Sequence, residues 1–465
     1  MHMTAQNLDF DACYRAVSAR DARFDGRFYT AVKTTRIYCR PICPARTPAA
    51  RNVRFYRHAA SAEAAGFRPC KRCRPELSPG DPGWDVRGDF VGRALRLIDD
   101  GSADAGVAGL ARRLHITERH LHRLFVAELG VGPLAVARTR RLLLAKQLLT
   151  ETDLPVTDVA FAAGFGSVRQ FNATMRDTYG FTPSELRATA RGAGAATPPT
   201  DGGTASLRLK LHRRDPYDAE AIFRFLAARA IPGLEEADTT RYTRAVPGGT
   251  ITLTPHEGHI TLDATVEDTR CLSRLVARSR RLLDLDADPM AIGEALAQTS
   301  LAPLVATRPG LRVPGAFDGF EMAVRAVVGQ QISVAGARTL LGRIVARTGF
   351  LTAESLADAD LTGLGMTTRR VATLKALAER VSEGEIDLDG GQEPGEAFNA
   401  LLEVPGIGPW TAGYIGLRAL RDPDAWPDGD LVLRKRMAAL DIPDDHIERW
   451  RPWRAYAALH LWSAS

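Results

Sequence analysis

The segments IYCRPICPA, at residues 37–45, and RPCKRC, at residues 68–73, hold four of the six cysteines of this 465-residue chain. The four residues are Cys39, Cys43, Cys70 and Cys73. Two close pairs divided by a longer loop can surround one metal ion, because each pair ligates from one turn and four thiolates close a tetrahedral shell. The spacing therefore predicts one Zn²⁺ and a small N-terminal module that folds around it.

Basic residues are concentrated in the same part of the chain. Residues 1–80 contain 15 Lys and Arg against 6 Asp and Glu, a balance of +9, whereas residues 191–465 contain 32 against 36. This asymmetry indicates a polyanionic partner, most simply DNA or RNA. Neither a membrane span of ~20 apolar residues nor an export signal is visible in the sequence, so we expect a cytoplasmic protein without a membrane partner. In that compartment clustered cysteines bind metal or react rather than form disulfides.

A zinc ion with four thiolate ligands admits two interpretations. The ion can serve only to hold together a module that has few apolar residues. Alternatively, the excess negative charge leaves the sulfurs nucleophilic, so that one of them can accept the methyl group of a DNA methylphosphotriester. The site would then lose one negative charge and repel DNA phosphates less, which would make methylation a switch of DNA affinity. The spacing alone does not choose between the two.

Two helical repeats fill the middle of the chain. The stretches GVAGLARRLHITERHLHRLFVAELG, at residues 106–130, and PVTDVAFAAGFGSVRQFNATMRDTYGFTP, at residues 155–183, each predict a helix, a turn and a second helix. Thr117 and Ser167 are suited to cap the second helix of each pair. The side chains that we expect to reach DNA bases are those of Arg119, Arg123, Arg169, Gln170 and Asn172. A plain helical bundle would show the same periodicity.

The C-terminal part begins with strands and continues with helices. Alternating apolar and polar residues at Arg241–Val266 predict an antiparallel meander, and the pattern is helical from about Asp284 onward. The stretch LLEVPGIGPWTAGYIGLRAL, at residues 401–420, predicts a helix-hairpin-helix. The backbone N–H groups around Gly406 and Gly408 can then hold a DNA phosphate without reading the base sequence.

Two acids follow the hairpin, Asp428 and Asp430 in WPDGDLVLRKRM at residues 426–437. Either acid can simply cap a helix. A carboxylate next to a sugar can also stabilise the oxocarbenium-like sugar that forms when a glycosidic bond breaks, or activate a water molecule. The residues alone leave both roles open.

The N-terminal segments resemble known repair and regulatory proteins. DGRFYTAVKTTRIYCRPICPAR and NVRFYRHAASAEAAGFRPCKRC are similar to the N-terminal domain of the Ada family, and VTDVAFAAGFGSVRQFNATMRDTYGFTPSELR is similar to the AraC-type DNA-binding domain. The resemblance implies irreversible self-methylation, with Cys39 as the methyl acceptor and the other three cysteines as the remaining zinc ligands. It also implies a transcriptional activator, with double-stranded DNA and RNA polymerase as the expected partners.

This chain departs from the Ada family at its C-terminal end. That family ends in an O6-alkylguanine transferase domain with a Pro-Cys-His-Arg active site, and no such tetrapeptide occurs here. Direct guanine dealkylation is therefore not expected. The two remaining cysteines, Cys13 and Cys271, lack the required neighbours, so we interpret them as ordinary small residues.

Residues from about 205 to 465 resemble AlkA-type 3-methyladenine DNA glycosylases of the helix-hairpin-helix superfamily. The matching stretches are PYDAEAIFRFLAARAI, RPGLRVPGAFDGFEMAVRAVVGQQISVA, the hairpin and RWRPWRAYAALHLW. The resemblance places the catalytic carboxylate at Asp430, with Asp428 as the alternative because the loop is one residue longer than in the relatives. It places the aromatic base pocket, which would stack on a flipped cationic purine, at Phe225, Trp410, Tyr414 and Trp462.

The resemblance also predicts what this half of the chain lacks. A further pocket tyrosine of the relatives is Leu431 here, and the leucine that fills the gap left by the flipped base is Gln331. Members that also cleave the DNA strand carry a Schiff-base lysine where Trp410 stands, so we expect base excision alone. No cysteine follows Cys271, so we expect neither an iron–sulfur cluster nor another cofactor in this half.

Together these observations predict a mainly α multidomain protein that is active as a monomer. The expected parts are a zinc module of α+β type at residues 1–79, an AraC-type double helix-turn-helix domain at 84–190, a flexible linker at 191–204, an antiparallel β subdomain at 205–290 and the helical helix-hairpin-helix subdomains at 291–465. We expect a repair protein that accepts methyl groups, activates transcription and excises alkylated purines. The alternative is a zinc-stabilised regulator whose C-terminal fold binds DNA without catalysis.

Overall fold

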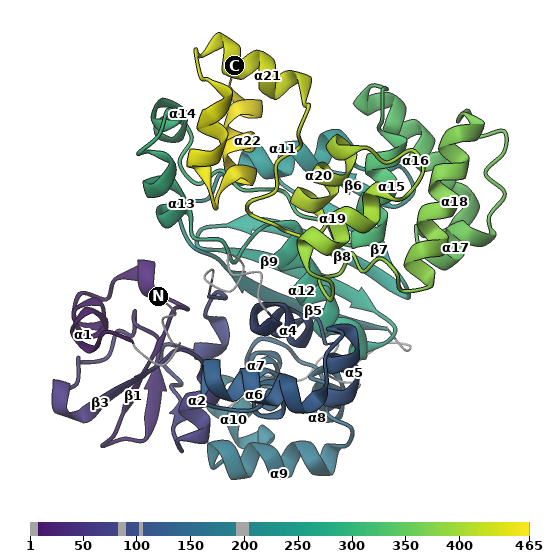
Figure 1. The fold of residues 1–465 in the computed structure, drawn as a ribbon. Helices are drawn as coiled ribbons and strands as arrows, with labels where there is room; N and C mark the ends of the chain where they lie inside the picture. Colours follow the sequence, from purple (N-terminus) through teal and green to yellow (C-terminus); the bar gives the residue numbers. More distant parts are fainter. Residues whose placement is uncertain (1–7, 82–89, 102–105, 192–203, 465) are drawn as a thin grey trace.

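A computed structural model of the chain describes residues 8–81, 90–101, 106–191 and 204–464. Figure 1 shows an N-terminal module with a small sheet, a helical middle part, and a larger C-terminal lobe with a second sheet. The prediction of a mainly α multidomain protein is confirmed. None of the helices in these ranges is long and apolar enough to span a bilayer. Residues 192–203 of the expected linker lie outside this part of the chain.

The sheet of the N-terminal module brings the two cysteine segments together. Its strand order is β3–β1–β2–β4, with β2 parallel to β4 and the other pairs antiparallel. Tyr38 on β2 lies opposite Pro69 on β4, so the next residue of each segment is a cysteine at the same end of the sheet. The elements are α1 (Phe10–Ala19), β1 (Tyr29–Val32), β2 (Ile37–Cys39), β3 (Val53–Tyr56), α2 (Ala59–Ala64) and β4 (Arg68–Pro69).

The middle part consists of helices in which the predicted caps are present. The Thr117 side chain accepts a hydrogen bond from the His120 N–H (3.2 Å), and Ser167 accepts one from the Gln170 N–H (3.1 Å). The two helix-turn-helix units are therefore α5–α6 and α8–α9. The helices are α4 (Phe90–Asp99), α5 (Gly106–Arg113), α6 (Glu118–Leu129), α7 (Pro133–Glu151), α8 (Val156–Ala162), α9 (Val168–Tyr179) and α10 (Pro183–Arg191).

The second sheet contains the predicted meander and more. Its antiparallel strands have the order β5–β9–β8–β7–β6. The segment expected as a β subdomain also contains two helices, α11 (Ala219–Arg229) between β5 and β6, and α12 (Leu272–Leu282) after β9. The strands are β5 (Ala205–His212), β6 (Glu235–Ala237), β7 (Tyr242–Val246), β8 (Gly249–His256) and β9 (His259–Val266).

The remainder of the C-terminal lobe is helical, as expected. The hairpin lies between α19 and α20, and α21 begins at Leu431 directly after Asp430. The helices are α13 (Pro289–Leu296), α14 (Ala302–Thr307), α15 (Gly319–Val328), α16 (Val334–Thr348), α17 (Ala353–Asp358), α18 (Thr368–Ser382), α19 (Pro394–Leu402), α20 (Pro409–Arg418), α21 (Leu431–Ala439) and α22 (Arg454–Ser463).

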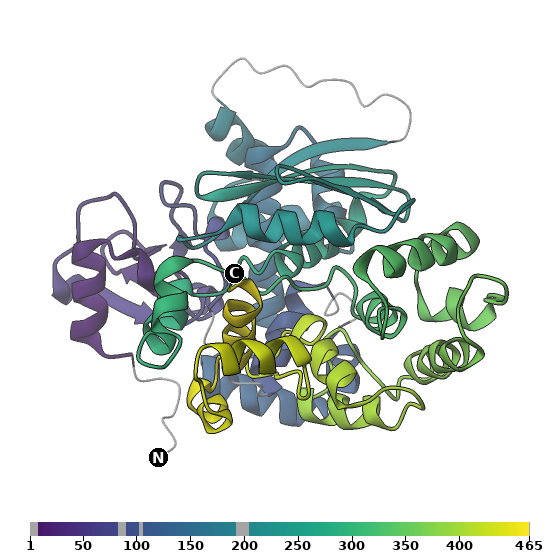
Figure 2. The ribbon, with the colours of Figure 1, turned by 90° about the horizontal axis from the view of Figure 1, so that it is seen from above.

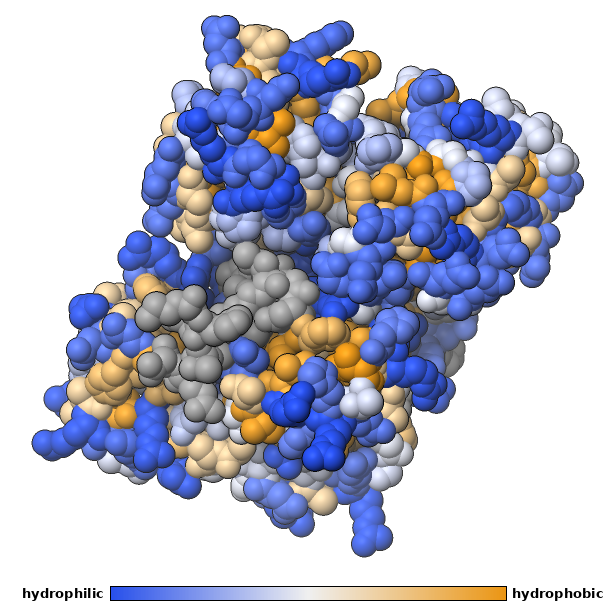
Figure 3. Space-filling view, viewed as in Figure 1, coloured by the Kyte–Doolittle hydropathy of each residue, from blue (hydrophilic) through white to orange (hydrophobic). Residues whose placement is uncertain are grey.

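The helical middle part and the second sheet share one hydrophobic core. Buried residues of α7–α10, such as Leu148 and Phe171, belong to the same cluster as Leu209 and Leu262 of the sheet. Figure 2 shows the sheet lying close to these helices. On the face shown in Figure 3, most residues are hydrophilic, and hydrophobic residues gather in separate patches, one of them near α4. The middle part and the sheet are therefore packed together rather than separated.

Residues Glu76–Asp81 are rich in Pro and Gly, a composition typical of a linker, yet they form a segment packed against other parts of the chain. The Glu76 carboxylate is almost fully buried, where it accepts hydrogen bonds from Lys146 of α7 (2.7 Å) and from Arg74 (3.1 Å). The Gly80 N–H donates to the Asp286 carboxylate of the C-terminal lobe (2.9 Å). Composition could not reveal these contacts, because both partners come from distant parts of the chain.

Glu63 lies buried where the N-terminal module meets α7 and α9. Its carboxylate accepts hydrogen bonds from three hydroxyl groups, those of Tyr38 (3.0 Å), Tyr179 (3.2 Å) and Thr139 (2.6 Å). Burial raises the pKa of Glu63, and these hydroxyl donors oppose the rise only in part. One acid of α2 thus links the module to both helices.

We expect Glu63→Ala to lower the free energy of unfolding by about 3 kcal/mol, because three buried hydroxyl groups lose their acceptor. Urea unfolding followed by circular dichroism would measure the change. Glu220→Ala is the matched control, since Glu220 forms only an exposed pair with Arg224 and should change stability by less than ~0.5 kcal/mol. Equal effects of the two substitutions would contradict the linking role of Glu63.

Candidate functional site

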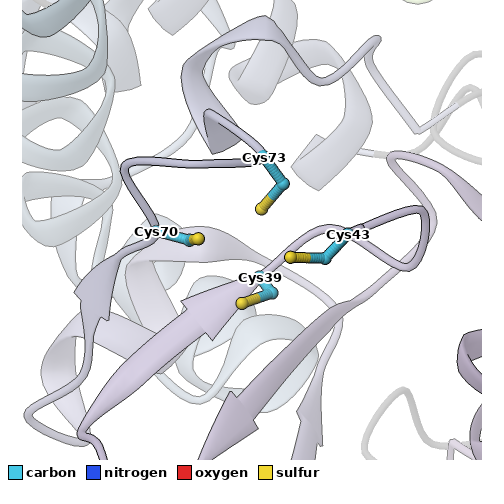
Figure 4. A group of neighbouring side chains, drawn as sticks. All are labelled: Cys39, Cys43, Cys70 and Cys73. Atoms are coloured by element: carbon cyan, nitrogen blue, oxygen red, sulfur yellow. The ribbon is translucent and has the colours of Figure 1, made fainter. Parts of the chain in front are cut away.

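The four predicted cysteines meet at one point. Their Sγ atoms all lie within 4.8 Å of one another, and Figure 4 shows the sulfurs pointing into the same space. Four sulfurs at ~2.3 Å from a shared zinc ion would lie ~3.8 Å apart, so the cluster fits the ion. Cys70 and Cys73 are buried, whereas Cys39 and Cys43 are half-buried and lie on the more accessible side. The cluster would therefore hold one zinc ion, with Cys39 and Cys43 on its more accessible side.

Backbone and side-chain groups around the cluster favour thiolate sulfur. The Arg40 N–H donates to Cys73 Sγ and the Arg72 N–H to Cys70 Sγ, both at 3.3 Å. The buried Arg40 side chain also donates to Cys73 O (3.2 Å) and pairs with Asp25. The sulfurs thus lie among hydrogen-bond donors, which is the environment that a metal-bound thiolate requires.

Not all arginines near the cysteines face the solvent. Arg40 is buried, the Arg68 side chain donates to Tyr179 O (3.2 Å), and Arg74 contacts Thr150 and Glu151 of α7. Arg68 and Arg74 thereby join the module to the helical middle part, and Arg40 is used inside the module, so fewer cations are free to contact DNA than the net charge indicates. The basic residues of the module that are exposed, Arg68 among them, are Arg15, Arg20, Arg23, Lys33, Arg36, Arg46, Arg51, Arg54, Arg68, Lys71 and Arg72.

The other two cysteines have poor nucleophilic character. Burial, assisted by Asp9, raises the pKa of the Cys13 thiol to about 11. Burial also raises the pKa of Cys271. Both therefore stay protonated at neutral pH, in line with their interpretation as small packing residues.

The second helix of each helix-turn-helix unit presents its polar face to the solvent. Leu121 and Phe125 of α6, and Phe171 and Met175 of α9, are buried at a spacing of four residues. The opposite faces carry the residues expected to contact DNA, of which Arg119, Arg123, Arg169 and Gln170 are exposed and Asn172 is half-buried.

The hairpin before α20 is held from both sides. Gly406 has a φ of +97°, and a Cβ there would lie 2.2 Å from Thr373 Oγ1, so a larger residue does not fit. The Gln330 amide donates to Gly406 O and to Thr411 Oγ1, both at 3.0 Å. At Gly408 an added Cβ would meet nothing within 4 Å, which leaves the N-terminus of α20 open to a phosphate.

The four predicted base-pocket residues line one cavity of about 510 Å³ together with Asp430. The cavity lies between α11, α15, α16, α20 and α22. The rings of Trp410 and Tyr414 are stacked at 5.4 Å between centroids and 5° between planes, and Trp462 meets Tyr414 edge-on at 6.3 Å. A cavity of this size and aromatic character can hold a flipped base.

Asp430 is fixed at the wall of this cavity. It caps α21 by accepting hydrogen bonds from the Val432 and Leu433 N–H groups at Oδ1, both at 2.9 Å. The indole N–H of Trp410 donates to Oδ2 (2.8 Å), and that of Trp462 donates to Oδ1 (3.3 Å). Two of the predicted aromatic residues therefore orient the predicted carboxylate.

The alternative acid does not share this environment. Asp428 is exposed, accepts a hydrogen bond from the Gly429 N–H (2.9 Å), and lines a separate cavity beside Trp426. Leu431, at the position of the relatives' pocket tyrosine, is 64% exposed and does not line the aromatic cavity. The geometry thus favours Asp430.

Two arginines of the cavity went unnoticed in the sequence. Phe225 lies between Arg229 and Arg418, whose guanidinium carbons are 3.8 Å and 4.6 Å from its ring centroid. Although burial would raise the pKa of Tyr414, Arg418 and Arg229 lower it, and Arg418 donates to the Tyr414 hydroxyl (2.7 Å). Each arginine follows a predicted aromatic residue by four positions, a helical spacing that could have revealed them.

The expected wedge residue lies at the mouth of the cavity. Gln331 is exposed at a φ of +57°, in the turn between α15 and α16, and its neighbours Ile332 and Ser333 line the cavity. The adjacent Gln330 was not among the predicted site residues, and its side-chain amide forms hydrogen bonds to the hairpin. Of the two glutamines in GQQIS, Gln330 therefore contacts the hairpin, whereas Gln331 lies at the mouth of the cavity.

Three family models match parts of the chain. They are the metal binding domain of Ada at residues 12–76, a helix-turn-helix domain at residues 110–189 and the AlkA N-terminal domain at residues 208–318. The cysteine cluster lies within the first match, which supports the prediction of one zinc ion. Together with the geometry, the matches define a DNA-binding protein of the repair class that also carries a transcription-factor domain.

Curated relatives extend the likeness over the whole chain. One from Mycobacterium tuberculosis (strain ATCC 25618 / H37Rv), described as "Probable bifunctional transcriptional activator/DNA repair enzyme AlkA", is 47% identical over 480 residues, which cover 98% of this chain and 96% of the relative. The chain belongs to this family of bifunctional transcriptional activators and DNA repair enzymes.

Relatives of each half are found in Escherichia coli (strain K12). DNA-3-methyladenine glycosylase 2 is 35% identical over 276 residues, or 54% of this chain and 95% of the relative. The bifunctional transcriptional activator/DNA repair enzyme Ada is 36% identical over 180 residues, or 39% of this chain and 49% of that protein.

We expect purified protein to contain one zinc ion per chain, measured by atomic emission together with protein concentration. Cys43→Ser and Cys70→Ser should each lower the zinc content, because three thiolates bind the ion less tightly than four. Cys13→Ser is the matched control and should keep its zinc. Full zinc content in both ligand variants would show that the ion is held elsewhere.

Proposed function

We propose that the chain repairs alkylated DNA in two ways and reports the damage to transcription. The N-terminal module takes methyl groups from DNA methylphosphotriesters onto Cys39, and the methylated protein activates transcription. The C-terminal lobe excises alkylated purines such as 3-methyladenine from DNA. The observation that carries the second activity is the Asp430 carboxylate, held by two indole N–H groups at the wall of an aromatic cavity.

In the first reaction the Cys39 thiolate attacks the methyl carbon of the neutral phosphotriester. A sulfur–carbon bond forms while the carbon–oxygen bond breaks, and the electron pair stays on the phosphate oxygen, which becomes an ordinary diester anion. Zinc, when bound, keeps the four sulfurs deprotonated at neutral pH. The half-buried position of Cys39 gives the phosphate access, and the exposed cations of the module hold the DNA backbone nearby.

In the second reaction the flipped nucleotide places its base in the cavity and its sugar at Asp430. As the glycosidic bond breaks, the electron pair leaves with the base and positive charge develops on the sugar. The Asp430 carboxylate stabilises this charge and orients water for attack on the same carbon, which gives an abasic site. Trp410 carries no amine at the lyase lysine position, so we propose hydrolysis without strand cleavage.

The aromatic residues of the cavity divide the work of holding the base. Phe225 is already covered by two guanidinium groups, so stacking on the base falls to Trp410, Tyr414 and Trp462. Outside the cavity, Gln331 fills the gap in the duplex and the backbone around Gly406 and Gly408 holds a phosphate. We assign the polar face of α6 and α9 to promoter DNA, through the residues named for these helices.

Several finer parts of the proposal follow the sequence. We propose domain limits at residues 1–79, 84–190, 205–290 and 291–465, a monomer as the active form, RNA polymerase as the partner in activation, and a cytoplasmic location. After methylation, Cys39 has lost its negative charge and the protein binds the promoter more tightly, which would bring it into contact with RNA polymerase.

We expect Asp430→Asn to lower base excision at least 100-fold, because a neutral amide stabilises the cationic sugar poorly. Release of 3-methyladenine from methylated duplex DNA would be measured in single-turnover conditions. Asp428→Asn is the matched control, two residues away and outside the cavity, and should keep wild-type excision. If Asp430→Asn excises bases at the normal rate, the carboxylate assignment is wrong, and if the wild type releases none, the lobe only binds DNA.

We expect one added methyl group on Cys39 after incubation with methylphosphotriester DNA, detected by mass spectrometry of the tryptic peptide. Cys39→Ser should stay unmodified, because a hydroxyl is not deprotonated by these surroundings. Unmodified DNA of the same sequence is the control and should transfer nothing. A wild-type protein that contains zinc and stays unmethylated would leave the cysteine cluster with a structural role alone.

A further inference from the structure

The contact between the N-terminal module and the C-terminal lobe is built around Arg214. This side chain is only 6% exposed. Its guanidinium donates to three backbone carbonyls, those of Asp25 (2.6 Å), Gly80 (2.7 Å) and Asp286 (2.6 Å). Asp25 belongs to the module and Asp286 to the lobe, so one buried cation holds both parts in a fixed orientation.

The module side of this contact leads directly to the cysteines. The Asp25 carboxylate, itself buried, pairs with Arg40, and Arg40 Nε lies 2.9 Å from Asp25 Oδ1. Arg40 follows Cys39 in the chain and donates its backbone N–H to Cys73 Sγ (3.3 Å). Asp25 therefore contacts Arg214 through its carbonyl and Arg40 through its carboxylate, and Arg40 in turn contacts the cysteine cluster.

The lobe side leads to the aromatic cavity. Arg214 stands shortly before α11, the helix that supplies Phe225 and Arg229 to the cavity. The segment between them is anchored, because the buried Arg312 donates to Arg214 O (2.7 Å) and the Tyr217 hydroxyl donates to Leu283 O (3.0 Å). A shift of Arg214 would thus move the start of α11.

Close packing at this junction leaves little room for adjustment. Gly26 has a φ of +83°, and a Cβ there would lie 2.1 Å from Pro79 O and 2.7 Å from Arg214 Nη2. Arg27 forms a further ion pair with the buried Asp288, which caps α13. Figures 1 and 2 both place α13 next to the N-terminal module. The junction is therefore a built interface with polar contacts on both sides.

We propose that Arg214 is a positioning residue that couples the cysteine cluster to the base-excision cavity. Zinc bound at the cysteines fixes Cys73 and Arg40, which hold Asp25 against Arg214 and thereby the start of α11. Loss of zinc releases Arg40 and Asp25, loosens α11 and slows base excision. The coupling rests on the proposed function of the cavity and adds a dependence on the state of the other site.

The experiment compares the zinc-loaded and the chelated full-length chain. Hydrogen–deuterium exchange of α11 is the structural readout, and single-turnover excision from methylated duplex DNA is the kinetic one. In the wild type, zinc removal should raise exchange in α11 and slow excision at least ~5-fold. In Arg214→Gln, exchange in α11 should already be raised with zinc bound, and zinc removal should change neither readout.

Two further variants separate coupling from a general loss of structure. Asp25→Asn keeps the backbone carbonyl that binds Arg214 but breaks the pair with Arg40, so it should remove the zinc dependence as well. Arg208→Gln removes an exposed arginine that pairs with Asp263 outside the junction, and should keep the full zinc response. If Arg214→Gln does not fold, Asp25→Asn decides.

The outcomes are distinct. A wild type whose α11 exchange does not respond to zinc, or an Asp25→Asn variant that keeps the wild-type response, would overturn the coupling. A wild type that excises no alkylated base would overturn the proposed function of the cavity, while the exchange measurement would still decide whether the two sites communicate.

Discussion

The hydrophobic core shared by α7–α10 and the sheet β5–β9 is the constraint on which the arrangement of the other parts depends. Leu148 and Phe171 of the helices lie in one buried cluster with Leu209 and Leu262 of the strands. Apolar burial is the dominant favourable term in folding, so separating the helices from the sheet would expose a surface that neither part can hide alone. Polar groups also join β5 to α7. The Gln147 side chain donates to Lys210 O, and the Lys210 N–H donates to the Glu151 carboxylate, both at 3.0 Å. Because β5 is an edge strand, these contacts close an edge that would otherwise be open. Once this core has formed, the N-terminal module meets both neighbours at fixed distances, which allows single side chains such as Glu63 and Arg214 to join the parts.

The basic side chains of the N-terminal module have two roles, which the net charge of the module does not distinguish. Arg40 and Lys146 are buried, one paired with Asp25 and the other with Glu76, and both also donate to backbone carbonyls of the cysteine pair at Cys70 and Cys73. Removing such charged groups from water costs free energy, and this cost is offset only where each group has its full set of ion-pair and hydrogen-bond partners. Lys146 thereby joins the metal module to α7, whereas Arg40 holds the cysteine pair against Asp25 within the module. The exposed arginines and lysines are the ones left to attract a DNA backbone. Their electrostatic field also acts on the cysteine cluster, whose net charge depends on the state of its four sulfur ligands.

Features with a local signal were predictable from the sequence. Thr117 and Ser167 cap their helices because a hydroxyl next to a free N–H needs no distant partner, and the four cysteines meet because two turns carry them in pairs. The contacts between parts were not predictable. Arg214 and Asp25 are separated by 189 positions, and no periodicity records that one will lie beside the other. The segment from Glu76 to Asp81 has the composition of a linker, yet its acid is buried against Lys146. Within the cavity, the aromatic residues were predicted from the sequence. Arg229 and Arg418 were not predicted, because their importance depends on which face of each helix turns into the cavity.

Asp430 satisfies a requirement of the fold in a way that also suits the chemistry proposed for it. An aspartate before a helix is usually explained by its cap alone, and Asp430 does cap α21. Its two oxygens, however, are not equivalent. Oδ1 accepts the Val432 and Leu433 N–H groups and the Trp462 indole, whereas Oδ2 accepts only the Trp410 indole. A carboxylate oxygen has about two lone-pair directions, so Oδ1 is fully used and Oδ2 keeps one direction for a water molecule or a sugar. The cap therefore fixes the carboxylate through one oxygen and leaves the other for the proposed reaction. Because Trp410 also forms part of the aromatic wall, a base that stacked on this residue would press on the group that orients Oδ2, and the proposed mechanism would thereby link recognition of the base to the placement of the reacting oxygen.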